Sequence, residues 1–386
     1  AQNPCRGYLA CGKAKALPSE HVFLCITMQT FKVKAGDSSY EVIIGEGAWR
    51  ELRNFPRERY TSTFIITERG LWTRWGKTLL KEGGLPGAKT LFVPAGEASK
   101  SLRMLERLAG QLLKLGADRR SLLVLFGGGV IGDLGGFLAS VYMRGVDCVH
   151  VPTTVLAQVD SSIGGKTAVN LKEMKNLIGT FYPPRLVVSD SRVLSSLSSR
   201  NFRSGLYEVV KHAMLEGTGF FAQLEKCAGS LGPENVAALE PILPHAAKVK
   251  INVVNYDERE ANLRMTLNLG HTFGHALEEV THYERFVHGE AVAWGLLAIS
   301  RLSQRLGMLK AAEGERMERL VWRLGPLPSI RDLSAAKILR LLPQDKKAIA
   351  GKVQWVVPEK IGKVRVVTEV TPQVAAAAFR DIQRMN

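Results

Sequence analysis

The chain has 386 residues, of which 46% are hydrophobic and 23% are charged, with 37 Gly and 16 Pro. This composition excludes a mainly disordered, collagen-like or coiled-coil protein, and the length favours two domains. No apolar run approaches the roughly 20 residues needed to cross a bilayer, which excludes an integral membrane protein and predicts no membrane partner.

The formal net charge of +16 raises the question of a nucleic-acid partner. Lys and Arg are scattered along the chain, with no run of five and no basic stripe interleaved with aromatic residues. We therefore expect no nucleic-acid partner and favour an enzyme whose site attracts anions. The five cysteines form no CxxC pair, which indicates a reducing, cytoplasmic location.

The beginning of the chain differs from the rest. Residues 1–27 are irregular and hold three of the five cysteines, and strand-like patterns begin only after Met28. We expect 1–27 to be a non-native or disordered leader, with Met28 as the natural start. The remainder is predicted to form an α/β domain over 28–198 and an α-helical domain over 199–386.

Short apolar runs alternate with helical patterns in the first half, as at 101–115, and this alternation predicts a mostly parallel sheet covered by helices. The strands are predicted at 30–33, 40–44, 63–67, 90–93, 122–126, 146–151 and 186–188. Beyond about residue 198 helical periodicity dominates, at 203–215, 241–254, 272–281, 290–306 and 312–324. A late strand pair at 352–357 and 363–367 precedes a final helix.

A glycine loop follows the predicted strand 122–126. Residues 127–133 read GGGVIGD and contain the pattern G-x-G-x-x-G between a strand and a helix. Such glycines let backbone amides approach a pyrophosphate at a helix N-terminus, so the loop predicts dinucleotide binding. About four strands precede the loop, which indicates a strand order different from that of the usual Rossmann fold.

A second loop, DSSIGGKT at 160–167, resembles a phosphate-binding P-loop. The P-loop pattern requires Gly where this chain has Asp160, which excludes the ATPase interpretation. The loop is interpreted as a Gly-Gly turn that presents Lys166, with Asp160 nearby.

Histidines and carboxylates of the second half suggest a metal. His271 and His275 are four residues apart, His288 precedes another helix, and Glu208 shares a helical face with Lys211. Two imidazoles and a carboxylate with an open fourth position describe a catalytic zinc site. The residues alone allow either His271 with His275 as ligands, or His271 with His288.

Together these stretches resemble the 3-dehydroquinate synthase family over residues 31–386. The resemblance rests on motifs that include GGGVIGDLGGF, YMRGV, VPTTVLAQVDSSIGGKTAVN, KNLIGTFYPP, EVVK, DERE, LNLGHTFGHALE, HGEAV and DKK. It implies a Rossmann-like NAD-binding domain, a helical metal- and substrate-binding domain, and an active site in the cleft between them. It also implies a homodimer.

The family converts the sugar phosphate 3-deoxy-D-arabino-heptulosonate 7-phosphate to 3-dehydroquinate and orthophosphate in the shikimate pathway. It uses NAD catalytically together with zinc or cobalt. A hydroxyl is oxidised transiently, phosphate is eliminated, the ketone is reduced, and ring opening with an aldol closure follows.

The resemblance also implies roles for individual residues. The metal ligands would be Glu208, His271 and His288, and the catalytic residues Lys211, His275, Asn268 and Asp160. The substrate would be bound by Arg144 from a neighbouring subunit, Lys166, Asn176, Lys250, Arg264, Lys346 and Lys347, with the choice between the last two for the phosphate left open. NAD would be bound by Glu68, Glu97, Lys100, Gly129, Val130, Ile131, Gly132, Asp133, Thr153, Thr154, Lys166 and Lys175.

The sequence departs from the family pattern at 171–174, where Leu-Lys-Glu-Met replaces the usual His-Pro-Leu-Gly, and at Ala95, Tyr207 and His212.

Three other functions fit the sequence less well. A 2-deoxy-scyllo-inosose synthase acts on a substrate without a carboxylate, which Lys250 and Arg264 argue against. A polyol dehydrogenase related to glycerol dehydrogenase needs no phosphate pocket. An inactive nucleic-acid-binding or scaffold protein would not be expected to keep the complete ligand set.

Overall fold

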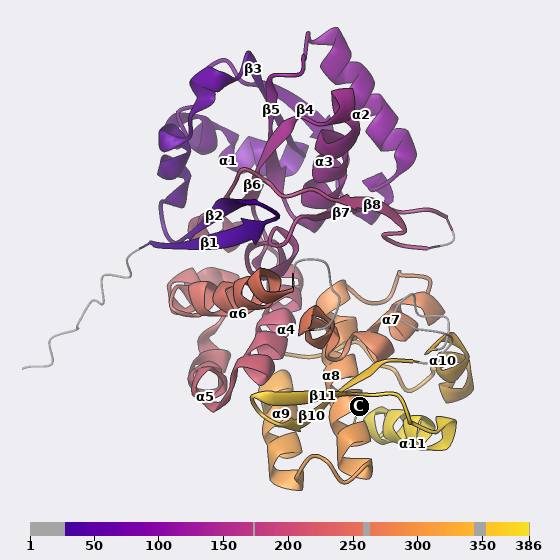
Figure 1. The fold of residues 1–386 in the computed structure, drawn as a ribbon. Coiled ribbons are helices and arrows are strands. Elements are labelled where there is room, and N and C mark those ends of the chain that lie inside the picture. The colour runs from indigo at the N-terminus through magenta and orange to yellow at the C-terminus, as the bar shows by residue number, and fades with distance from the viewer. Residues whose placement is uncertain (1–27, 173, 258–262, 343–352, 386) are drawn as a thin grey trace, which may run out of the picture.

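The computed structural model describes residues 28–172, 174–257, 263–342 and 353–385. The expected leader at 1–27 and the candidate substrate residues Lys346 and Lys347 lie outside the described residues. Figure 1 shows a sheet-containing half followed by a helical half, with α4 and α6 next to the sheet-containing half.

A seven-stranded sheet forms the centre of the first half. Its strand order is β1-β2-β9-β6-β5-β3-β4, and only β1 is antiparallel to its neighbour. The strands are β1 (Gln29–Ala35), β2 (Ser38–Ile44), β3 (Ser62–Glu68), β4 (Lys89–Val93), β5 (Ser121–Gly127), β6 (Asp147–Pro152) and β9 (Leu186–Ser189). The strand before the glycine loop, β5, pairs with β3 and β6, so the expected departure from the usual Rossmann order is confirmed.

Both faces of the sheet are buried. In β5, Val124 and Phe126 face one hydrophobic cluster, whereas Leu123 and Leu125 face another, because successive strand residues point to opposite sides. Helices α2 (Leu102–Lys114) and α3 (Gly129–Val141) cover the second face, and α1 (Arg69–Glu82) follows β3. Full burial on both faces explains why these strands are nearly continuous apolar runs in the sequence.

The helical half packs around α8, most of which is buried. Its elements are α4 (Ser199–Glu216), α5 (Thr218–Cys227), α6 (Ile242–Tyr256), α7 (His271–Val280), α8 (His288–Arg305), α9 (Ala311–Arg323), α10 (Ala335–Leu341), β10 (Trp355–Lys360), β11 (Lys363–Val367) and α11 (Pro372–Gln383). The larger hydrophobic cluster continues from the sheet into these helices, so the two halves share a core.

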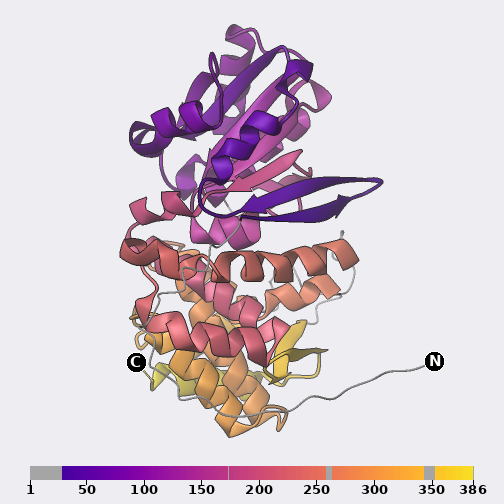
Figure 2. The same ribbon diagram turned by 90° about the vertical axis from the view of Figure 1, so that its left-hand side faces the viewer.

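The β1–β2 hairpin lies over the helical half, as Figure 2 shows. The backbone N–H of Lys34 donates to Oδ1 of Asn255 on α6 over 2.7 Å, and the amide of Asn255 donates to the carbonyl of Lys32 over 3.1 Å. The edge strand β1 is therefore attached to the second half.

The predicted strands and helices of both halves are confirmed, within a few residues at their ends. One hairpin was missed: β7 (Lys166–Val169) pairs with β8 (Ile178–Phe181), where the sequence suggested only a turn. Its strands have only four residues each and show little apolar alternation. The hairpin depends on packing of β7 against α3, which is so close that a side chain at Gly136 would lie 2.5 Å from Thr167. None of the helices in the described ranges is long and apolar enough to cross a membrane.

Candidate active site

Three potential metal ligands from three helices meet in the helical half. Glu208 lies on α4, and His271 and His288 are the first residues of α7 and α8. The Nε2 atoms of His271 and His288 lie 3.5 and 3.4 Å from Oε1 of Glu208. Atoms that bind one tetrahedral ion at about 2.0–2.1 Å are about 3.4 Å apart, so an ion of the size of zinc fits this group.

The second ring nitrogen of each histidine faces an oxygen. Nδ1 of His271 lies 3.2 Å from the carbonyl oxygen of Leu269, and Nδ1 of His288 lies 3.3 Å from Oε2 of Glu278. A hydrogen bond donated from Nδ1 leaves the Nε2 lone pair available to a metal. Both oxygens of Glu208 are buried: Oε2 contacts Nζ of Lys211, and Oε1 faces the two histidines, so Oε1 is the oxygen placed to bind a divalent cation together with them.

Close packing of α7 against α8 sets the distance between the two histidines. Gly270, which precedes α7, has φ +79°, and a side chain at Gly295 of α8 would lie 1.8 Å from the carbonyl oxygen of Gly270. At the start of α8, the backbone N–H of Val287 donates to Oε2 of Glu290 over 3.0 Å. Glu290 of the HGE motif therefore caps the helix that carries the second histidine.

His275 lies near this group without joining it. Its ring centroid is 5.5 Å from that of His271 and 6.5 Å from that of His288. A second set of possible ligands also exists in the described residues, formed by Asp160, Glu208 and His212. Glu208 belongs to both sets and contacts Lys211, but Asp160 contacts Lys211 and Lys250, so the second set brings more positive charge to a bound cation. We therefore favour the group with two histidines.

Asp160 joins the two lysines of the site. It lies on the short helix η5 (Ala157–Ser161), where its Oδ2 is 3.1 Å from Nζ of Lys211 and its Oδ1 contacts Nζ of Lys250. Burial would raise the pKa of Asp160, but the charges of Lys211 and Lys250 hold it well below its usual value. Burial would likewise raise the pKa of Glu208, but the charge of Lys211 and the contact with His288 keep it below its usual value.

Burial lowers the pKa of both ammonium groups, but their charged neighbours differ. Burial lowers the pKa of Lys250 to about 8, with Lys211 and Arg264 acting in the same direction and Asp160 opposing them. The pKa of Lys211 is raised, because Asp160 and Glu208 together outweigh the effect of burial. Of these two lysines, Lys250 is therefore the one whose charge changes near pH 8.

The residues expected to hold the substrate carboxylate lie close to this cluster. Arg264, in the short helix η9 (Leu263–Asn268), is 1% exposed and donates from Nη2 to the carbonyl of Gly164 over 3.2 Å. Asn268 ends the same helix and is half-buried, and Lys166 begins β7 and is exposed. The described substrate candidates thus come from both halves.

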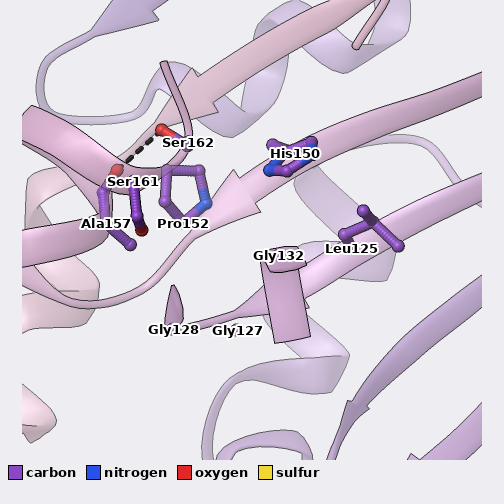
Figure 3. A pocket seen from close by; sticks show the side chains of 9 residues that line it. All are labelled: Leu125, Gly127, Gly128, Gly132, His150, Pro152, Ala157, Ser161 and Ser162. Carbon is purple, nitrogen blue, oxygen red and sulfur yellow. Dashed lines mark hydrogen bonds between the residues drawn. The ribbon is translucent and has the colours of Figure 1, made fainter. Parts of the chain in front are cut away.

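The glycine loop connects β5 to α3 at the carboxyl ends of the parallel strands, where α/β sheets bind ligands. Figure 3 shows a small hollow beside it, lined by Gly128, Gly132, His150, Ser161 and Ser162 among others. A side chain at Gly128 would lie 3.0 Å from Thr154, so the loop passes close to the residues that follow β6. Gly128, Gly129 and Val130 at the start of α3 are half-buried, and a backbone without side chains can approach a pyrophosphate there.

The other NAD candidates form a polar network around this loop. Lys100 contacts Asp133 on α3 and also Asn176, and Asn170 donates to Oε1 of Glu97 over 2.8 Å. Further candidates lie at the ends of strands: Glu68 ends β3, and Thr153 and Thr154 follow β6, while Val130 and Ile131 lie in the first turn of α3. Burial raises the pKa of Glu68.

Two residues with implied binding roles, Arg144 and Lys175, lie away from the glycine loop or contact other groups in this chain. Arg144 is exposed and follows α3, a helix of 13 residues and therefore about 20 Å long, so that helix separates it from the glycine loop. Lys175, expected to bind NAD, has its Nζ 3.4 Å from Oε1 of Glu278 on α7.

Two residues near the metal group were not among the sequence candidates. Glu278 lies seven residues after His271, on the same helical face, and this spacing could have identified it. His212 is fully buried, and in the described chain neither ring nitrogen has a hydrogen-bond partner. Burial and the neighbouring Lys211 lower the pKa of His212 to about 4, so the ring is neutral at pH 7.

Similarity to solved structures extends over the whole fold. A 2-deoxy-scyllo-inosose synthase, solved with carbaglucose-6-phosphate, NAD+ and Co2+, is 25% identical, with a TM-score of 0.80 over 92% of this chain and 99% of that one. The 2-epi-5-epi-valiolone synthase of Streptomyces hygroscopicus subsp. jinggangensis, with NAD+ and Zn2+ bound, is 26% identical, with a TM-score of 0.82 over 92% and 100%.

Sequence similarity identifies the family. The models of the 3-dehydroquinate synthase N-terminal and C-terminal regions match residues 90–204 and 205–348. The 3-dehydroquinate synthase of Solibacter usitatus is 38% identical over 92% of this chain and 99% of its own length, and that of Dictyoglomus turgidum is 41% identical over 89% and 95%. The chain belongs to the 3-dehydroquinate synthase family.

Proposed function

We propose that the chain converts 3-deoxy-D-arabino-heptulosonate 7-phosphate to 3-dehydroquinate and orthophosphate, as a carbon–oxygen lyase. One observation carries this proposal: Lys211 contacts Glu208 of the metal group and also Asp160, which in turn contacts Lys250. A site that places a divalent cation beside several buried cationic side chains suits a substrate with a hydroxyl to oxidise, a carboxylate and a phosphate. Family membership supports the same reaction.

Glu208, His271 and His288 would hold the metal, and the residues of the glycine loop with Glu97 and Lys100 would hold NAD. When bound, NAD supplies a hydride acceptor and the divalent ion a Lewis acid.

The side chains of this chain would then bind and orient the substrate. Lys250 and Arg264 would hold its carboxylate, since a guanidinium group can donate two parallel hydrogen bonds to a carboxylate. Asp160 contacts Lys211 and Lys250 and favours the charged form of both, and Lys250 is charged below about pH 8. His275, beside the metal group, would exchange a proton with the phosphate, and Asn268 lies in the preceding turn.

We further propose that the enzyme is a cytoplasmic homodimer, with 28–198 as the NAD-binding domain and 199–386 as the metal- and substrate-binding domain. The dimer follows from the role that the resemblance implies for Arg144 at a phosphate of the neighbouring subunit, and the exposure of Arg144 at the far end of α3 agrees with that role. Cross-linking and sedimentation of the purified chain test the dimer.

The test of the reaction is a comparison of substrates. Orthophosphate release is measured with the heptulosonate phosphate and with a hexose 6-phosphate that has no carboxylate, in the presence of NAD and zinc. The proposal predicts release from the heptulosonate alone, because Lys250 and Arg264 need the carboxylate as a partner. Equal or faster release from the hexose phosphate would assign the chain to another cyclase reaction.

A further inference from the structure

Glu278 lies behind a candidate metal ligand. Its carboxylate is 5% exposed, with Oε2 3.3 Å from Nδ1 of His288 and Oε1 3.4 Å from Nζ of Lys175. Each carboxylate oxygen thus has its own cationic or N–H partner. A carboxylate buried to this extent is stable only when its charge is compensated, so both contacts matter for its placement.

Lys175 comes from the other half of the molecule. It lies in the connection between β7 and β8, and its Nζ is 4.2 Å from the ring centroid of Tyr283, which follows α7. The next residue, Asn176, contacts Lys100, which pairs with Asp133 on the glycine-loop helix. A line of polar contacts therefore leads from the start of α3 to a metal ligand.

The two oxygens of Glu278 face groups of different kinds. Oε2 faces a ring nitrogen of His288, which can donate an N–H group to it, and Oε1 faces the ammonium group of Lys175. The first contact orients the imidazole ring, and the ion pair across the two halves compensates the charge of the buried carboxylate.

We propose that Glu278 is a positioning residue that holds His288 in the tautomer and orientation required for metal binding, and that Lys175 holds Glu278. This inference rests on the metal site of the proposed function. It makes Lys175 part of the support of the metal site, although this residue belongs to the sheet-containing half. Metal affinity therefore depends on a residue that contributes no ligand atom.

The test measures the affinity of the metal-free full chain for Zn2+, by competition with a chromogenic chelator, and the visible absorption of bound Co2+. The variants are Glu278→Gln, Glu278→Met, Lys175→Met and the double variant with Met at both positions. Glu279→Gln is the matched control, because Glu279 is the exposed neighbour on the same helix. His271→Ala removes one proposed ligand and shows whether Zn2+ binds at this site. Circular dichroism shows that each variant is folded.

We expect Zn2+ affinity to fall about 10-fold in Glu278→Gln, whose amide oxygen still accepts a hydrogen bond, and about 100-fold in Glu278→Met, in line with partners of metal-binding histidines elsewhere. Lys175→Met weakens binding less, and adds nothing when combined with Glu278→Met, because the two residues act through one contact. The Co2+ spectrum changes in the Glu278 variants and not in Glu279→Gln.

Two outcomes overturn the inference, and they differ in what they say of the proposed function. Normal Zn2+ affinity in both Glu278 variants, with binding lost in His271→Ala, removes Glu278 from the support of the metal and leaves the proposed function in place. Normal affinity in His271→Ala as well shows that the metal lies elsewhere, and the metal site of the proposed function fails together with the inference.

Discussion

The ammonium group of Lys250, on α6 of the helical half, contacts Oδ1 of Asp160 on η5, which follows the sheet. The pair is largely buried and joins the two halves of the molecule at the candidate substrate site. Because Oδ2 of the same carboxylate faces Lys211, the position of Asp160 determines the positions of both lysines.

The lowered pKa of Lys250 predicts a pH dependence. Lys250 is charged below about pH 8 and loses its charge as the pH rises through that value, so capture of the substrate carboxylate weakens on the alkaline side. We expect kcat/KM, which reports on the free enzyme, to fall above about pH 8. In Lys250→Arg the fall should move to higher pH, because guanidinium stays charged. A wild-type profile that is flat from pH 7 to well above pH 9 would contradict this role.

The two histidines of α7 should respond differently to removal. His271→Ala takes away one of three ligands, and we expect loss of bound metal together with loss of activity. His275→Ala should reduce turnover while the metal content, measured by atomic emission, stays near that of the wild type. Metal loss in His275→Ala would show that the ligand set is wrong.

Arg264→Ala should mainly weaken substrate binding. A charged hydrogen-bonded pair is worth about 2–3 kcal/mol, so the dissociation constant for the substrate should rise accordingly. Titration calorimetry of the metal-loaded enzyme measures it, with Arg285→Ala as a control, since Arg285 pairs with Asp332 at the surface. Unchanged affinity would count against a role for Arg264 with the carboxylate.

The packing of α7 against α8 can be tested through stability. In Gly295→Ala the added methyl group would meet the carbonyl oxygen of Gly270 at 1.8 Å, so the helices must separate. We expect the free energy of unfolding to fall by about 1–3 kcal/mol, as for other overpacked sites, and metal affinity to fall with it. Gly110→Ala is the control: Gly110 is exposed within α2 with nothing near it, and Ala there should stabilise by up to about 1 kcal/mol. Thermal and urea unfolding measure the stability of both variants. A Gly295→Ala variant as stable as the Gly110→Ala variant, or more stable, would refute this explanation.

The sequence predicts the sheet and the main helices well because the spacing of their apolar residues follows the faces that they bury. The buried strand β5 and the amphipathic α2 are clear examples. The hairpin β7–β8 was missed because its short strands depend on packing against α3 rather than on a pattern of their own.

Only part of the candidate site could be predicted from the spacing of its residues. The spacing of His271 and His275 allowed them to be paired ligands, and only the fold brings His288 from α8 and Glu208 from α4 to one point. Glu278 was overlooked because it stands beside the exposed Glu279 in an ordinary helical pattern. Lys175 was assigned to NAD by resemblance, and its contact with Glu278 depends on how the loop meets α7.

The most direct test of the proposed function is the ratio of orthophosphate released to NAD supplied. The metal-loaded enzyme is given 3-deoxy-D-arabino-heptulosonate 7-phosphate with trace NAD, before and after chelation of the metal. The proposed function predicts release far in excess of NAD, without accumulation of NADH and abolished by the chelator. No release, or NADH formed in proportion to the substrate consumed, would contradict it.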